Sequence, residues 1–264
     1  MLGRALVGQR LIGREDPDIS DAVQDILARE GIAIRLGADD IRFARDGDGV
    51  AVTASKADPV PIRASHVLVA TGRRPNTDDL GLDAAGVETD AGGYVTVDES
   101  LQSTVPHIWA MGDCNGRGAF THTAFNDFEI VASNLLDGGA RRVTDRTPAY
   151  ALYIDPPLGR TGMTEAEARA AGKRVRVGMR PMSRVGRAVE RGETAGFLKV
   201  VIDADSDAVL GAAILGVEGD EAIHSIIDGM ALGASAATFR SIMHIHPTVA
   251  ELIPTVFGEL GDPG

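Results

Sequence analysis

The sequence predicts an α/β portion followed by an α+β domain built around an antiparallel sheet. Two observations support this. Up to about residue 146, short strand-like pieces end at glycine turns and only two long helices are expected. From about residue 147, apolar and polar residues alternate over several segments, as in strands with one buried face. A chain of 264 residues is long enough to bury such cores.

The first predicted helix spans residues 18–30. Its apolar side chains share one face, and Gly31 follows where a left-handed residue commonly ends a helix. The run from Asp46 to Gly49 predicts a tight turn between two strands. Four short strands are expected in this part of the chain: residues 32–36, 41–44, 50–54 and 66–70.

Before residue 140 we expect two further strands, at 94–97 and at 108–111, the second of them buried and ending at Gly112-Asp113. Residues 122–136 show helical spacing of apolar side chains, and a glycine pair stops the pattern. The next segment, residues 140–148, contains three arginines and a proline and looks like a boundary.

Beyond this boundary, Thr164 and Glu167 form a capping box that opens a short helix. Alternation then predicts the antiparallel strands: residues 175–179, 198–202 and 209–215. An amphipathic helix containing Ile223, Ile226, Ile227 and Met230 is expected after Asp220, and a final short helix after Pro247.

Composition excludes several classes of function. A net charge of −12 argues against binding nucleic acid, which calls for clustered Lys and Arg. No apolar stretch approaches membrane-spanning length, so we expect no membrane association and a cytoplasmic protein. The single cysteine, Cys114, rules out an internal disulfide and a cysteine-based zinc site.

Three segments together carry a family resemblance. They are residues 70–77, residues 110–113 with 121–124, and residues 244–251. In this order and spacing they resemble the class I pyridine nucleotide–disulfide oxidoreductases, the family of glutathione reductase, dihydrolipoamide dehydrogenase and mercuric reductase. Residues 153–164 look like the opening of that family's dimerisation domain. Each segment alone is weak, but the ordered set is specific and covers nearly all of the chain.

The resemblance implies a division into three parts. Residues 1–72 would be a partial NAD(P)-binding domain, residues 73–146 the C-terminal segment of the FAD-binding domain, and residues 147–264 the dimerisation domain. The fold class is therefore expected to be an α/β remnant of the FAD/NAD(P)-binding domains followed by the α+β dimerisation domain.

The resemblance also implies cofactor-binding residues. Asp113 would accept hydrogen bonds from the ribityl hydroxyls of FAD, with Gly112 allowing close approach of the backbone. The helix beginning near Thr121 or His122 would direct its N-terminal amides and dipole at the flavin. Gly72 would lie beside the nicotinamide nucleotide. The alternatives remain that Asp113 caps a turn and that Gly72 merely ends a strand.

His246 and Glu251 form the predicted catalytic pair. In the family, the matching histidine carries protons at the dithiol of the partner subunit, and the glutamate orients it. The alternative is that Glu251 belongs to a capping box, Thr248-Val249-Ala250-Glu251, and satisfies a backbone N–H. A metal site that adds His244 is the weakest interpretation, and we predict none. Cys114 is expected to be a small apolar filler rather than a redox thiol.

Two family hallmarks are absent. The chain has no G-x-G-x-x-G fingerprint and no C-x-x-x-x-C pair, and the resemblance begins only near Arg10. We therefore expect a truncated, homodimeric member of the family. It would be a fragment of an FAD- and NAD(P)H-dependent oxidoreductase that reduces a disulfide or a metal ion. Whether this chain alone binds FAD stays open. The alternatives are a non-catalytic homodimerisation module, and one half of a split flavoenzyme with a separate N-terminal half. The strand at 209–215 and the Ile223-to-Met230 helix are expected to form the dimer interface.

Overall fold

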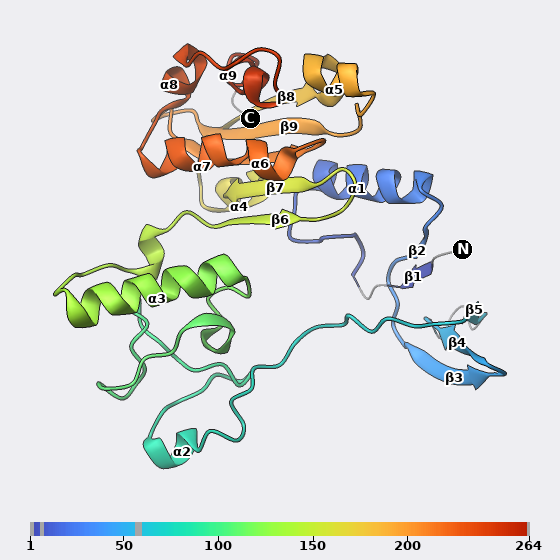
Figure 1. The fold of residues 1–264 in the computed structure, drawn as a ribbon, viewed down its shortest axis with the longest axis vertical. Helices are drawn as coiled ribbons and strands as arrows, with labels where there is room; N and C mark the ends of the chain where they lie inside the picture. Colours follow the sequence, from blue (N-terminus) through green and yellow to red (C-terminus); the bar gives the residue numbers. More distant parts are fainter. Residues whose placement is uncertain (1–2, 6–7, 56–59, 263–264) are drawn as a thin grey trace. The chain divides into compact units, whose positions relative to one another are not determined.

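A computed structural model of the chain describes residues 3–5, 8–55 and 60–262. The chain divides into two compact units (Figure 1). Unit 1 takes in the described residues up to 69 and those from 148 onward, and unit 2 comprises residues 70–147. The boundary expected at residues 140–148 therefore coincides with a change of unit. The division into residues 1–72, 73–146 and 147–264, which the family resemblance implies, remains a prediction.

Unit 1 is built on a five-stranded antiparallel sheet with the strand order β6-β7-β10-β9-β8. The strands are β6 (Ala149–Leu152), β7 (Leu158–Gly162), β8 (Val175–Pro181), β9 (Phe197–Asp203) and β10 (Val209–Leu215). The register places Ala212 of β10 opposite Val200 of β9 and Thr161 of β7. The antiparallel sheet predicted from alternation is confirmed, and the turn after Asp203 connects β9 to the central strand β10.

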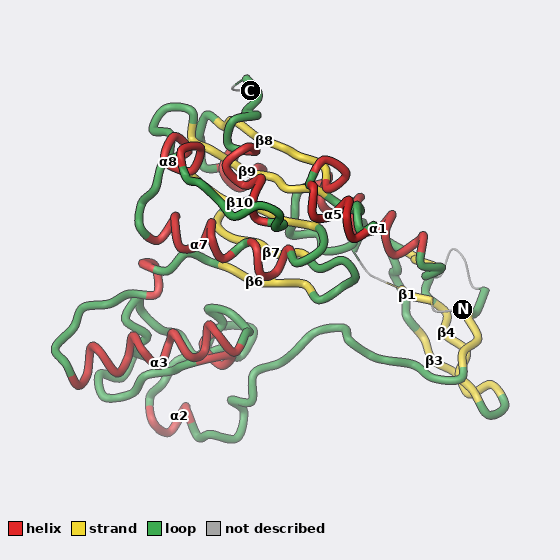
Figure 2. Tube along the Cα trace, turned by 45° about the horizontal axis from the view of Figure 1, so that its top comes forward, coloured by secondary structure: helices red, strands yellow, loops and turns green. Residues whose placement is uncertain are grey.

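Helices cover both faces of this sheet (Figures 1 and 2). On one face, the alternate residues Val200, Ala212 and Ile214 pack against the C-terminal helices in the largest core. Those helices are α5 (Gly186–Arg191), α6 (Gly219–Ala222), α7 (His224–Ala231), α8 (Ala236–Ser241) and α9 (Ile253–Val256). Short 3-10 turns precede α5 and α9, at Met182–Arg184 and Ala250–Leu252. The final helix expected after Pro247 is therefore present.

The opposite face carries helix α1 (Pro17–Arg29), whose buried side chains pack against Leu158 and Leu215. The helix ends as predicted, with Gly31 at φ +84°. Helix α4 (Glu165–Ala170) also lies on this face, against Val175 and Val201. Its predicted capping box is formed: Thr164 Oγ1 accepts from the Glu167 N–H at 3.0 Å, and Glu167 Oε2 accepts from the Thr164 N–H at 2.8 Å.

Helices of the same protomer cover both faces of the five-stranded sheet. The expectation that β10, Ile223 and Ile226 form the dimer interface is therefore wrong. Strand β10 is buried along most of its length, and Ile223 and Ile226 belong to the protomer's own core. Apolar strands and helices suit an interface and a core equally well by composition. Which of the two they form depends on how much of the surface the chain covers itself.

The described N-terminal strands form two small sheets. Strand β1 (Gly3–Ala5) pairs in parallel with β2 (Ala33–Arg35). Strands β3 (Arg42–Asp46), β4 (Gly49–Thr53) and β5 (Ile62–Ala64) form an antiparallel sheet in that order. The predicted tight turn joins β3 to β4, with Gly47 at φ +59°.

The strand expected at residues 66–70 does not form. These residues are irregular, and the side chain of Leu68 is 90 % exposed. A strand of a parallel sheet exists only when a neighbour accepts its ladder of hydrogen bonds. Among the described residues no strand pairs with this segment.

Unit 2 consists of a long helix, α3 (Thr121–Leu136), packed on irregular chain. A short helix α2 (Leu82–Ala85) and 3-10 turns at Gly112–Asn115 and Val143–Asp145 complete it. The long helix is confirmed, but the strands expected at 94–97 and 108–111 are reduced to isolated bridges such as Gln102 with Trp109. None of the helices in the described part of the chain is long and apolar enough to cross a membrane.

Candidate acid/base pair and cofactor turn

The predicted catalytic pair is assembled in unit 1. The distance from His246 Nδ1 to Glu251 Oε2 is 2.7 Å. The imidazole side chain is 80 % exposed, whereas the carboxylate side chain is only 10 % exposed. A carboxylate can only accept a hydrogen bond, so it orients the ring with Nδ1 as the donor and leaves Nε2 for another partner.

Glu251 serves both roles that the sequence left open. Its Oε2 atom also accepts from the Thr248 N–H at 3.2 Å. Only the glutamate half of the predicted capping box is formed, because the Thr248 hydroxyl donates instead to the carbonyl of Ile245 at 2.8 Å. Burial of the neighbouring Val249 and Ile253 anchors this segment to the core.

A feature that sequence reasoning missed lies beside this carboxylate. A Cβ atom placed on Gly186, at the start of α5, would lie 3.3 Å from Glu251 Oε1. That approach is tighter than an ordinary van der Waals contact, so glycine allows α5 to pass close to the glutamate. Nothing in the sequence around Gly186 signals this long-range contact.

His244 takes no part in the pair. Its Nδ1 atom lies 2.6 Å from the carbonyl oxygen of Ala250. Within residues 3–5, 8–55 and 60–262, no group of three His, Cys, Asp or Glu side chains is placed to hold a metal ion.

The predicted cofactor residues lie in unit 2. Gly112 has φ +75°, and a Cβ there would lie 3.3 Å from the Cβ of Ala124. The next residue, Asp113, is more than half exposed, and its Oδ2 accepts from Arg73 Nη1 at 3.2 Å. Arg73 directly follows Gly72, which is exposed with φ +133°. This ion pair brings the two predicted glycine turns together.

Helix α3 begins at Thr121, within one residue of the predicted start. The ring of Phe120 stacks on that of His122, with centroids 5.2 Å apart and planes inclined by 15°. The helix packs directly against the Gly112–Asn115 turn through Ala124. The predicted positions Gly112, Asp113, Thr121 and His122 therefore belong to one corner of unit 2.

A second feature that the sequence did not reveal is a carboxylate buried behind this corner. Asp127 projects from α3 and is 1 % exposed. It pairs with Arg146 at 2.6 Å and accepts from the backbone N–H of Gly112 at 2.9 Å. The available signal was weak: an aspartate among the apolar residues of a helix that should be partly buried.

Cys114 lies in the same turn and packs against the core of unit 2. Its Sγ donates to the carbonyl of Met111 at 3.3 Å. Burial raises the pKa of the Cys114 thiol, and the nearby carboxylates of Asp127 and Asp113 add to this effect. The neutral thiol is a poor nucleophile.

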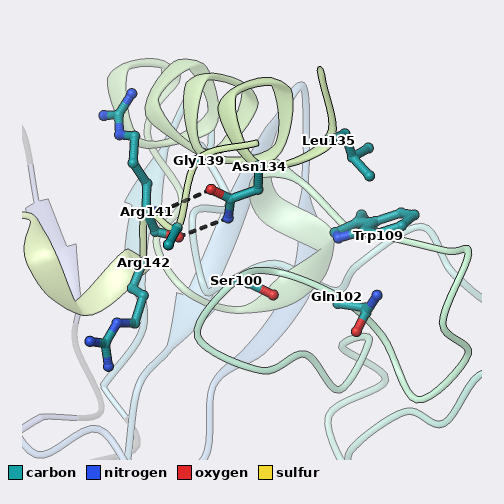
Figure 3. Close-up of a pocket in the computed structure, with 9 residues that line it drawn as sticks. Ser100, Gln102, Trp109, Asn134, Leu135, Gly139, Arg141 and Arg142 are labelled. Carbon is teal, nitrogen blue, oxygen red and sulfur yellow. Dashed lines mark hydrogen bonds between the residues drawn. The ribbon is translucent and has the colours of Figure 1, made fainter. Parts of the chain in front are cut away.

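A shallow pocket of about 400 Å³ also opens in unit 2 (Figure 3). Trp109, Leu135, Ser100 and Gln102 form its walls. The side chain of Asn134 closes one end through hydrogen bonds of 2.8 Å to the backbone of Arg141, whose guanidinium extends away from the pocket (Figure 3). The predicted cofactor residues do not line this pocket.

Comparison with known proteins assigns the chain to a family. Residues 7–127 match the family model described as pyridine nucleotide-disulphide oxidoreductase, and residues 148–257 match the dimerisation domain of the same family. Among curated proteins, the probable pyridine nucleotide-disulfide oxidoreductase RclA of Escherichia coli is 34 % identical over 92 % of this chain and 55 % of its own length. The mercuric reductase of Streptomyces lividans is 32 % identical over 94 % of this chain and 52 % of its own length.

Solved structures agree with these matches. The HOCl-induced flavoprotein disulfide reductase RclA of Escherichia coli superposes with a TM-score of 0.89 at 32 % identity, over 97 % of this chain and 58 % of that one. A further curated sequence relative, the dihydrolipoyl dehydrogenase of Thermus scotoductus, is 32 % identical over 89 % of this chain and 51 % of its own length. The chain thus spans about half the length of the curated relatives it matches. It belongs to the class I pyridine nucleotide–disulfide oxidoreductase family and contains that family's dimerisation domain.

Proposed function

We propose that this chain supplies the proton-handling and dimer-forming part of an FAD- and NAD(P)H-dependent oxidoreductase that reduces a disulfide or a metal ion. The observation that carries the proposal is the exposed imidazole of His246, oriented at 2.7 Å by the nearly buried carboxylate of Glu251. Such a pair is suited to general acid/base work near neutral pH.

In this proposal His246 moves a proton at Nε2. With Nδ1–H donated to Glu251, the neutral ring accepts a proton at Nε2 from a thiol and later returns it. The Glu251 carboxylate, 2.7 Å from Nδ1, would stabilise the imidazolium between these events. A bound FAD, held at the corner formed by Gly112, Asp113, Thr121 and His122, would supply the chemistry of hydride and electron transfer between NAD(P)H and the acceptor.

The Gly112–Asp113 corner fits a flavin on its own chemistry. Asp113 presents an exposed carboxylate that can accept hydrogen bonds from hydroxyl groups, and Gly112 has no side chain that would keep a ligand away from the backbone. Helix α3 begins at Thr121 and His122, and the positive end of its dipole would favour an electron-rich group of a flavin at this position. Because the sequence has no glycine fingerprint, the pyrophosphate of FAD would have to be held by another segment.

A homodimer forms part of the proposal. Met243 and Ile245, just before His246, are 94 % and 79 % exposed. Large apolar side chains exposed beside a functional group are typical of a surface that a partner covers. A second copy of the chain covering this segment would also bring His246 to a partner's site. We place the protein in the cytoplasm, which suits a chain without a cysteine pair.

A second candidate is one half of a split flavoenzyme. Two apolar surfaces favour it: residues 67–69, which form no strand, and the exposed phenylalanines of α3, Phe125 and Phe128, whose ring centroids lie 5.8 Å apart. A separate N-terminal half that binds FAD would cover such surfaces and supply the missing fingerprint.

The test combines this chain with the part of Escherichia coli RclA that it does not match, expressed as a separate polypeptide. Flavin absorbance and NAD(P)H oxidation are measured for the chain alone and for the mixture. The variant His246→Ala should lower turnover by about 10²- to 10⁴-fold without changing flavin content. The control His224→Ala, an exposed histidine on α7, should leave turnover unchanged.

Two outcomes count against the proposal. If neither preparation takes up flavin although the chain dimerises, the non-catalytic dimerisation module is the better description. If His246→Ala and His224→Ala have the same turnover as the unmodified chain, the proton-handling role is lost.

A further inference from the structure

We propose that Asp127 is a positioning residue that holds the Gly112–Asn115 turn, and with it the Asp113 carboxylate, in the orientation that meets the flavin ribityl chain. The assignment of the flavin rests on the function proposed above. The claim that Asp127 holds the Gly112–Asn115 turn rests only on contacts within unit 2. Sequence patterns and family motifs had left Asp127 without any role.

The first step is the burial of a charge. Asp127 is 1 % exposed, so its carboxylate has lost almost all contact with water. An isolated buried carboxylate is strongly unfavourable, and such groups persist only when ion pairs and hydrogen bonds satisfy both oxygens. Both oxygens of Asp127 are satisfied, and every partner lies around the cofactor corner.

The second step concerns what each oxygen binds. Oδ1 accepts from Arg146 Nη1 at 2.6 Å. Oδ2 accepts from the backbone N–H of Gly112 at 2.9 Å and from Asn115 Nδ2 at 2.8 Å. Gly112 and Asn115 are the two ends of the 3-10 turn that carries Asp113. One carboxylate oxygen therefore pins both ends of that turn to α3.

The third step concerns the chain on either side of the Gly112–Asn115 turn, which is connected to the same ion pair by further hydrogen bonds. Asn115 Nδ2 also donates to the carbonyl of Ala110 at 3.0 Å, and Asn115 Oδ1 accepts from the N–H of Arg117 at 2.8 Å. Arg146 Nη2 donates to the carbonyl of Arg117 at 2.9 Å. The chain entering the turn and the chain leaving it are thus tied to the same ion pair.

The side chain of Asp113 takes no part in these hydrogen bonds. Its side chain is more than half exposed, and the ion pair with Arg73 at 3.2 Å joins two exposed groups, which contributes little rigidity. The direction of its carboxylate therefore follows the peptide between Gly112 and Asp113, and the N–H that fixes Gly112 is held by Asp127. A charge-assisted hydrogen bond to a buried carboxylate is well suited to that task.

The first experiment needs no flavin. Amide hydrogen exchange at Gly112 is measured by NMR in the full chain and in three variants: Asp127→Asn, Arg146→Lys and Asp203→Asn. Asp127→Asn should speed exchange at Gly112 by about tenfold or more, because the charged acceptor is lost. Arg146→Lys keeps the carboxylate charged and paired, so exchange at Gly112 should stay within about threefold of the unmodified chain.

Asp203→Asn is the matched control. Asp203 is also buried and also ion-paired, to Lys173 at 3.1 Å, but it lies in unit 1. The Asp203→Asn substitution should lower the free energy of unfolding without changing the exchange rate of the Gly112 amide. If Asp127→Asn fails to fold, the exchange rate of the Gly112 amide in the unmodified chain still tests the proposal. A Gly112 amide that exchanges as fast as an unprotected peptide overturns it.

The second experiment uses the flavin-loaded mixture with the RclA part. Asp127→Asn should raise the FAD dissociation constant about tenfold and shift the flavin absorption band, whereas Arg146→Lys should do neither. Unchanged FAD affinity in a variant whose Gly112 exchange has accelerated overturns the positioning role. If the unmodified mixture binds no flavin, the proposed function fails and the ligand assigned here fails with it, while the exchange result still reports the hold on the turn.

Discussion

At the scale of single residues, backbone conformation distinguishes two glycines that look alike in sequence. Gly112 and Gly138 have φ +75° and +67°. A Cβ on Gly112 meets Ala124 at 3.3 Å, whereas one on Gly138 meets nothing within 4 Å. Both substitutions carry the cost of a left-handed backbone, and only the first adds a steric conflict.

We therefore expect Gly112→Ala to lower the free energy of unfolding by about 2–3 kcal/mol and Gly138→Ala by about 1 kcal/mol. Trp109, the single tryptophan of the chain, lies in unit 2, so its fluorescence during urea unfolding reports both variants. Equal losses would show that the contact with Ala124 relaxes without cost.

At the scale of elements, one lysine joins three pieces of unit 1. Lys199 on β9 is 3 % exposed. Its ammonium lies 3.0 Å from Asp16, 2.7 Å from Asp18 and 3.0 Å from Glu165. Asp16 in turn accepts from the backbone N–H groups of Glu165 and Ala166 at 2.9 and 3.0 Å, at the start of α4. The cluster fastens α1 and α4 to the sheet.

Removing the lysine should leave the buried carboxylate of Asp16 and the partly buried carboxylate of Asp18 without their counter-charge. We expect Lys199→Met to lower the free energy of unfolding at pH 7 by about 3–5 kcal/mol. The control Arg174→Met removes an exposed arginine that is paired with the exposed Asp205 and should cost about 0–1 kcal/mol. Chemical unfolding of both variants checks the difference, and equal losses would contradict the role assigned to Lys199.

The same cluster predicts a pH dependence. Burial alone would raise the pKa of Asp16, but two backbone N–H groups and Lys199 outweigh it and hold the pKa below its usual range. Burial likewise would raise the pKa of Glu165, and the hydrogen bonds to Lys199 and Arg169 reverse the shift. A lowered carboxyl pKa adds stability above the unfolded value of about 4, and that stability is lost as the pH falls through the folded value.

Unfolding measured from pH 7 down to pH 3 should therefore show stability falling below about pH 4. The deficit of Lys199→Met should shrink over the same range, because its stranded carboxylates take up protons. A deficit that stays constant between pH 7 and pH 3 would mean that the carboxylates do not depend on Lys199.

At the scale of the whole molecule, the exposed segment before His246 governs assembly in the proposed homodimer. Ile245→Asp places a charge on an apolar side chain that is 79 % exposed. We expect it to weaken the dimer by about 30-fold or more, corresponding to a loss of about 2 kcal/mol. Sedimentation velocity should show monomers where the unmodified chain forms dimers.

The control for assembly is Leu136→Asp, the same charge introduced at an exposed leucine at the end of α3. It should leave the dimer intact. If both variants dimerise like the unmodified chain, the segment before His246 is not the interface.

Much of the architecture followed from local patterns in the sequence. The apolar stripes of α1 and α3, the Thr164 capping box and the alternation in β8, β9 and β10 each depend on residues close in sequence. The pairing of His246 with Glu251 was also accessible, because five residues separate them and a helix start lies between. The expected strands at 66–70, 94–97 and 108–111 failed because a strand needs a neighbour, and its sequence does not show whether one exists.

Short motifs in a specific order were sufficient to predict the family, the antiparallel domain, the contact between His246 and Glu251 and the Gly112–Asp113 turn. The three-dimensional structure was needed to show that β10 and Ile226 are buried within the protomer, whereas Met243 and Ile245 are exposed. It also decided that Asp127 and Lys199 are buried charges with partners from distant segments. The physical reason is that burial and charge pairing depend on segments far apart in sequence, and local composition specifies only that a residue can be buried.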